Sequence, residues 1–227
     1  MTLTWLLLPG LLTAAEPDKP AAVRYLRPDG DKFALESEVT RTTTDDGAVY
    51  VSRTDRGTQK MTLTLRYDKD GRLTSAEAVL ETARDKRTAT VTLRGTEGRL
   101  QRGGTTEAFT AAADPVVTTA PDWSDIFQLV RRYDARRGGR QEFPGLWFHP
   151  TQALLTPTFA IERIGSDDVV VQNRKVALTR YQVRLRNNAG YLVWADPDGR
   201  VCKILPRAAG ATPVLLEGYE EATRTLK

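Results

Sequence analysis

The chain has 227 residues, of which 40% are hydrophobic and 27% are charged, and its formal net charge is +4. This length lies near the upper limit of what one hydrophobic core organises, and the composition is that of an ordinary globular protein. The 33 basic and 29 acidic residues are dispersed along the chain. A net charge this small, spread along the chain, does not favour nucleic-acid binding, and we expect no nucleic-acid partner.

The first fifteen residues, "MTLTWLLLPGLLTAA", carry no charged side chain and end in small residues before Glu16. This pattern is typical of an export signal, and its apolar run is shorter than the roughly 20 residues of a membrane-spanning helix. An ordinary N-terminal core segment is the alternative. We predict a periplasmic or extracellular protein whose mature chain has no transmembrane segment. The predicted organisation is a signal peptide at 1–15, an N-terminal extension at 16–32 and one sheet domain at 33–227.

From Phe33 onward, apolar and polar residues alternate with a period of two. The clearest run has Met61, Leu63, Leu65 and Tyr67 in one phase, and similar runs occur near 33–39, 88–93 and 180–186. Such alternation places one set of side chains on a buried face of a strand. Short turn sequences such as "DDG", "DKDG" and "DPDG" separate the runs. The sequence therefore predicts a mainly β protein with an antiparallel meander.

One segment, "PDWSDIFQLVRRYDARRGG" at 121–139, breaks this pattern. Its apolar residues fall within an arc of about 160° at helical spacing, which predicts an amphipathic helix. Asp122 can cap its first turn, and two glycines mark its end, so we expect a helix at about 122–137. Because strands precede and follow it, the helix is expected to pack on the concave face of a curved antiparallel sheet.

The sequence Asp-x-Asp-Gly-Arg followed by an aliphatic residue occurs twice, at 68–73 and 196–201. Asp can cap a turn with its side chain, and Gly accepts the positive φ that closes it. A calcium loop would need further oxygen ligands at positions held by Arg66 in the first copy and by Trp194 and Leu205 in the second. We therefore predict two hairpin turns rather than metal sites.

Histidine and cysteine each occur once, as His149 and Cys202. Metal sites built from several such residues are excluded, and an unpaired thiol in an exported chain is expected to be buried. We predict no metal, no cofactor and no catalytic residue. A carboxylate pair assembled in space escapes detection from sequence, so a hydrolase remains an alternative.

The stretch "DWSDIFQLVRRYDARRGGRQEF", together with the late hairpin "YLVWADPDGRVCKIL", resembles bacterial exported β-rich families of unknown function. Their architecture is similar to the open half-barrel of the periplasmic lipoprotein carriers. The resemblance implies an open half-barrel, a non-enzymatic role and a hydrophobic groove as the working part. It implies no catalytic residue.

We expect an apolar or lipid-like ligand to bind in a groove between the sheet and the helix. The candidate ligand-binding residues come from the apolar arc of the helix and from the aromatic run near 143–149: Trp123, Phe127, Val130, Trp147 and His149. The ligand is expected to enter beside Trp147 and His149, and Phe127 is expected to be packed. An anionic surface is a further expected partner through Arg131, Arg132 and Arg136. The alternative is a structural or protein-interaction domain whose groove the helix fills.

Overall fold

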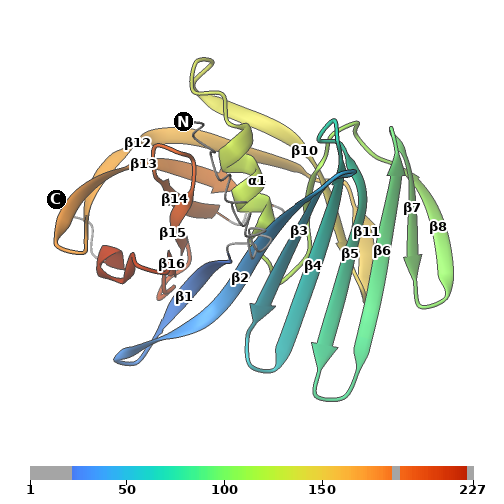
Figure 1. Cartoon of the computed structure of the whole chain (residues 1–227), viewed down its shortest axis with the longest axis horizontal. Helices are drawn as coiled ribbons and strands as arrows, with labels where there is room; N and C mark the ends of the chain where they lie inside the picture. Colours follow the sequence, from blue (N-terminus) through green and yellow to red (C-terminus); the bar gives the residue numbers. More distant parts are fainter. Residues whose placement is uncertain (1–21, 186–189, 224–227) are drawn as a thin grey trace, which may run out of the picture.

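A computed structural model describes residues 22–185 and 190–223. Within these residues, sixteen strands form one sheet that is mostly antiparallel and does not close (Figure 1). The first eight strands are β1 (Val23–Asp29), β2 (Lys32–Thr44), β3 (Gly47–Asp55), β4 (Gln59–Asp68), β5 (Leu73–Thr82), β6 (Lys86–Arg94), β7 (Glu97–Arg102) and β8 (Thr105–Thr110). The other elements are β9 (Val116–Thr118), α1 (Ser124–Arg132), β10 (Arg140–His149), β11 (Gln152–Leu155), β12 (Thr158–Val171), β13 (Arg174–Arg184), β14 (Gly190–Ala195), β15 (Val201–Pro206), β16 (Val214–Leu216) and the 3-10 helix η2 (Glu220–Thr223).

Most strands pair with their neighbours in the chain, so the meander prediction is confirmed. The sheet begins at β11, runs through β10 and β12 to β16, continues through β1, and ends at β8. β9 adds a short parallel pairing to β10. The sheet curls, and α1 lies inside the curve, as predicted (Figure 1).

β1 joins the two halves of the sheet. Tyr25 pairs with Leu216 of β16 on one side and with Ser37 of β2 on the other. The sheet thus takes in Val23–Asp29, which the sequence analysis assigns to an N-terminal extension. The signal peptide predicted at 1–15 lies outside the described residues.

A bulge in β2 changes which side chains face inward. Tyr25 pairs with Ser37 and Leu26 with Leu35, so Glu36 is an extra residue without a partner across the ladder. Because an extra residue reverses the alternation, Glu36 is buried while Leu35 is 42% exposed. The alternation near 33–39 predicts that Phe33 and Leu35 lie on the buried face and Glu36 on the exposed face, and this prediction is wrong. Arg56 stabilises the buried Glu36 carboxylate from 3.0 Å.

The helix is shorter than the predicted 122–137. Asp122 does reach its first turn, since Oδ1 accepts a hydrogen bond from the Ser124 N–H at 2.7 Å. After Arg132 the backbone becomes extended at Tyr133. The Asp134 carboxylate accepts the N–H of Arg136, and the Gln141 side chain bonds the Asp134 backbone, so these side chains hold a turn where further helix was expected.

Two hydrophobic clusters divide the interior. The first joins α1 to β12–β16 and includes Ile126, Leu129, Phe159 and Cys202. Cys202 is fully buried, as predicted, and burial raises the pKa of its thiol to about 11. The second cluster is built by β4–β7 and contains Met61, Leu63 and Leu65 in the predicted phase, together with side chains from β9 and β10.

The two Asp-x-Asp-Gly-Arg turns have the same hydrogen bonds, which confirms the turn prediction. Asp68 Oδ1 accepts the N–H groups of Asp70 and Arg72 at 3.0 and 2.8 Å. In the second turn, Asp196 Oδ1 accepts the N–H groups of Asp198 and Arg200 at 3.1 and 2.8 Å. The glycines, with φ of 76° and 75°, occupy the left-handed region that the turn requires. Among the described helices, none is long and apolar enough to cross a membrane.

Candidate functional site

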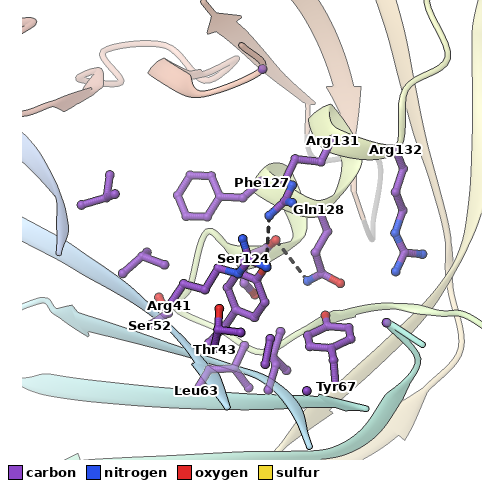
Figure 2. Close-up of a pocket in the computed structure, with 18 of the residues that line it drawn as sticks. Arg41, Thr43, Ser52, Leu63, Tyr67, Ser124, Phe127, Gln128, Arg131 and Arg132 are labelled. Carbon is purple, nitrogen blue, oxygen red and sulfur yellow. Dashed lines mark hydrogen bonds between the residues drawn. The ribbon is translucent and has the colours of Figure 1, made fainter. Parts of the chain in front are cut away.

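A groove of about 920 Å³ lies between α1 and the inner face of β1–β4 (Figure 2). Its apolar walls come from both the sheet and the helix: Val23, Tyr25, Val39, Ala48, Tyr50, Leu63, Leu65, Tyr67, Phe127 and Val201. Residues of three hairpin turns, at 43–47, 68–71 and 198–200, also line it. A volume of this size is within the range of roughly 300–1,000 Å³ typical of small-molecule sites.

The strand register decides which sheet residues reach the groove. Arg41 of β2 lies opposite Tyr50 of β3, and Tyr50 lies opposite Leu65 of β4. Two residues away on these strands, Ala48 of β3 lies opposite Tyr67 of β4. Because side chains alternate between the two faces of a strand, these residues share the inner face. Burial raises the pKa of Tyr67 to about 12, so its hydroxyl stays protonated near neutral pH.

One face of α1 forms the opposite wall. Ser124, Phe127, Gln128 and Arg131 line the groove, and their spacing of three and four residues places them on one side of the helix. The Phe127 ring stacks on the Tyr25 ring, with centroids 4.9 Å apart. Arg131 Nη1 donates to the Tyr50 hydroxyl at 3.1 Å, which connects helix to sheet across the groove.

Gln128 attaches the helix to β9. Its Nε2 donates to the Val117 carbonyl at 2.7 Å, and its Oε1 accepts the Val117 N–H at 3.0 Å. The side-chain amide therefore occupies the free edge of β9 as a neighbouring strand would, since β10 pairs with the other edge. Arg132 adds an ion pair of 2.9 Å to Asp114, which precedes β9.

Two buried carboxylates lie beneath the start of the helix. Asp122 Oδ2 accepts a 2.6 Å hydrogen bond from Ser52 Oγ of β3, which joins the helix to the sheet. Burial raises the pKa of Asp122, and burial together with the nearby Asp122 charge raises the pKa of Asp125 to about 7. Both aspartates stand outside the groove lining.

Of the predicted ligand-binding residues, Phe127 lines the groove in the part of the chain that the structure describes. It is partly buried against the first cluster rather than fully packed. Trp123 is 6% exposed, lies edge-on to Tyr191 at 5.8 Å, and faces the cluster. Val130 is 5% exposed and packs in the same cluster.

Trp147 and His149 lie elsewhere, at the end of β10. Their rings stack with centroids 5.9 Å apart and an interplanar angle of 4°. The His149 Nδ1 contacts the Thr151 hydroxyl at 2.9 Å, and burial lowers the pKa of the imidazole. The structure thus brings these two residues together with each other but not with Phe127.

The three arginines predicted to form a contact surface differ in environment. Arg131 reaches Tyr50, Arg132 pairs with Asp114, and Arg136 belongs to the turn after the helix. The anionic-surface contact stays a prediction.

Sequence reasoning missed the sheet wall, above all Arg41 and Tyr50. Arg41 is a single residue within the Thr-rich strand β2, Tyr50 is a single aromatic residue of β3, and the two form no motif. The alternation of side chains along β2 could have indicated Arg41. Because Arg41 follows Val39 by two residues, its side chain lies on the same inner face of the sheet.

No protein-family model matches this chain, and no curated protein matches it. Solved structures with a similar course of the chain include a beta-barrel-like protein of the domain of unknown function DUF1849 from Brucella abortus. Its sequence is 8% identical to this chain and the TM-score is 0.51. The match covers 86% of this chain and 93% of that protein. A DUF1089 family protein from Pseudomonas aeruginosa is 20% identical with a TM-score of 0.47, over 77% of this chain and 91% of that one. At such identities the likeness concerns the fold alone.

Proposed function

We propose that this protein is an exported, non-enzymatic binding or carrier module that holds an apolar or lipid-like ligand between the sheet and α1. The observation that carries the proposal is the groove of about 920 Å³ whose walls present apolar side chains from both layers. Burial of such surface by a ligand is favourable by about 25 cal/mol per Å².

The helix supports this proposal because its two sides have different surroundings. Ile126 and Leu129 are fully buried in the first cluster, so that side of the helix is filled core. Phe127 and Gln128, on the other side, remain partly buried and line the groove. The filled-core alternative thus accounts for one side of α1 but not for the groove that the other side lines.

Export belongs to the proposal and rests on the uncharged, apolar first fifteen residues and on the resemblance to half-barrel periplasmic carriers. If export occurs, the mature chain begins near Glu16. Mass spectrometry of protein recovered from the cell envelope tests this, and a full-length chain retaining Met1 would contradict it.

The binding role is tested with a neutral apolar probe, N-phenyl-1-naphthylamine, whose fluorescence rises in apolar surroundings. Ala48→Trp places a large ring in the groove, whereas Val49→Trp, one residue along β3, places the same ring on the outer face. We expect the wild type and Val49→Trp to bind the probe and Ala48→Trp to lose binding at least tenfold. Equal binding by all three proteins would place the probe outside the groove, and no binding by the wild type would contradict the proposed function.

A further inference from the structure

Two arginines meet at Tyr50 inside the groove. The Arg41 guanidinium lies 5.5 Å from the centroid of the Tyr50 ring, and Arg131 Nη1 lies 3.1 Å from the Tyr50 hydroxyl. Arg41 extends from the sheet and Arg131 from the helix (Figure 2). Their contacts with Tyr50 therefore come from two different walls of the groove.

In the part of the chain that the structure describes, these two arginines differ from the other arginines of the groove in having no acidic partner. Arg132 pairs with Asp114, and Arg200 pairs with Asp196 at 2.9 Å. Among the residues that the structure describes, neither Arg41 nor Arg131 lies within ion-pair distance of a carboxylate.

The acidic residues of the lining belong to the three hairpin turns, and none of them forms an ion pair with Arg41 or Arg131 in the described residues. The lining contains five cationic residues, Arg41, Lys69, Arg131, Arg132 and Arg200, and three acidic residues, Asp45, Asp68 and Asp198. Asp68 accepts two backbone N–H groups of its turn. Arg132 and Arg200 have acidic partners of their own, so the positive charge at Tyr50 is a local one that comes from Arg41 and Arg131.

A purely apolar ligand does not suit this arrangement. Its chain would cover Tyr50 and remove water from the two guanidinium groups without offering them an acceptor, which is unfavourable. A carboxylate or phosphate group would accept their hydrogen bonds, and planar guanidinium groups bind such oxygens in bidentate fashion. Apolar residues of the same lining lie close to this point, since Val39 is two residues from Arg41 on β2 and Leu65 lies opposite Tyr50 on β4.

We propose that the groove binds an amphiphile whose anionic head, a carboxylate or a phosphate monoester, lies between Arg41 and Arg131 at Tyr50, with its apolar chain along the wall formed by Val39 and Phe127. This proposal rests on the proposed function, since it names the ligand class of the same groove. Its particular claim is that the negative charge of the head, and not only the chain, determines affinity.

The test displaces N-phenyl-1-naphthylamine with decanoate, decyl phosphate and decan-1-ol, which share a chain and differ in head group, and with inorganic phosphate, which has no chain. We expect the wild type to bind decanoate and decyl phosphate roughly tenfold or more tightly than decan-1-ol, because hydrogen bonds to charged groups are the stronger ones. Inorganic phosphate should displace the probe far more weakly than decyl phosphate.

The variants Arg41→Gln and Arg131→Gln should each reduce this preference several-fold while retaining decan-1-ol and probe binding, which also shows that the fold is intact. The matched control is Arg66→Gln, which removes the same charge from the outer face of β4 and should leave the preference unchanged. The preference should also weaken as salt is added, because both arginines are exposed.

Equal affinity of the wild type for decanoate and decan-1-ol, with the probe still bound, would overturn the anionic-head proposal and leave the groove proposal standing. An equal loss of preference in Arg66→Gln would overturn it too, because overall charge would then be the cause. Displacement by inorganic phosphate as effective as that by decyl phosphate would indicate a free-anion site and overturn the amphiphile. Failure of the wild type to bind any of the probes would instead contradict the proposed function itself.

Discussion

The ring of Phe127 on α1 stacks on the ring of Tyr25 on β1, with centroids 4.9 Å apart and planes 22° apart. One face of Phe127 thus belongs to the interior, while its side chain also lines the groove. Tyr25 itself is held by a 3.1 Å hydrogen bond from its hydroxyl to the Val201 carbonyl. This contact packs α1 against β1 where both line the groove.

Phe127→Ala should reduce stability by less than the 3–5 kcal/mol typical of a fully packed Phe, because its ring is partly exposed, and should weaken decanoate binding. The matched variant is Phe159→Ala, which removes a fully buried Phe from β12 and should cost about 3–5 kcal/mol. Urea unfolding compares the two. A loss of stability in Phe127→Ala as large as that in Phe159→Ala would show a packed ring, and unchanged stability without any change in ligand binding would make Phe127 a surface residue.

Asp125 predicts a pH dependence of stability. Its pKa is raised by burial from 3.8 to about 7, so the folded chain keeps a proton that the unfolded chain releases over this interval. The free energy of unfolding should therefore fall as the pH rises from about 4 to about 7. Asp125→Asn, which cannot ionise, should be more stable than the wild type at pH 8 and similar to it at pH 4. Urea unfolding at these two pH values gives the comparison, and a variant less stable at pH 8 would contradict the assignment.

Gln128→Ala should loosen the contact between α1 and β9. The substitution leaves the N–H of the buried Val117 without its partner, a loss of roughly 1–3 kcal/mol, while the Val117 carbonyl keeps a 3.3 Å hydrogen bond from Ser124 Oγ. Hydrogen exchange at the Val117 amide should become faster, while exchange of Val91 in β6, which is paired with β5 and β7, should stay slow. Unchanged protection of Val117 would show that Gln128 does not hold β9.

Asp196→Ala should cost about 1 kcal/mol of stability, because Oδ1 of Asp196 accepts two backbone N–H groups of its turn. Asp68→Ala removes the same two bonds from the other copy and should have a similar effect. Thermal unfolding with and without calcium provides the control for a metal role. Calcium that raises the Tm of the wild type, but not of Asp196→Ala, would contradict the turn interpretation.

The parts of the fold that depend on local chemistry were predictable from the sequence. The phase of Met61, Leu63 and Leu65 and the two Asp-x-Asp-Gly-Arg turns follow from alternation and turn chemistry, and the structure has both. The bulge at Glu36 was not predictable, because the burial of Glu36 depends on Arg27 of β1 and on Arg56 of the turn between β3 and β4.

The groove was harder to predict because it exists only where the helix and four strands meet. Phe127 was found from the helical arc, since that pattern is continuous in sequence. Arg41 and Tyr50 come together through strand register, and Arg131 joins them through the position of α1. Trp147 and His149 share an aromatic run with no connection to the groove, because β10 carries them to the β11 hairpin.

The location of a bound ligand tests the central claim most directly. Decanoate bearing a photoactivatable diazirine on its chain would be cross-linked to the wild-type protein, and the labelled residues identified by mass spectrometry. We predict labels on Val39, Leu65 and Phe127, at positions that excess unlabelled decanoate protects and that the groove-filling Ala48→Trp variant loses. Competed labels confined to Trp147, His149 and the β10–β11 hairpin, or spread over the outer face of the sheet, would contradict binding in the groove.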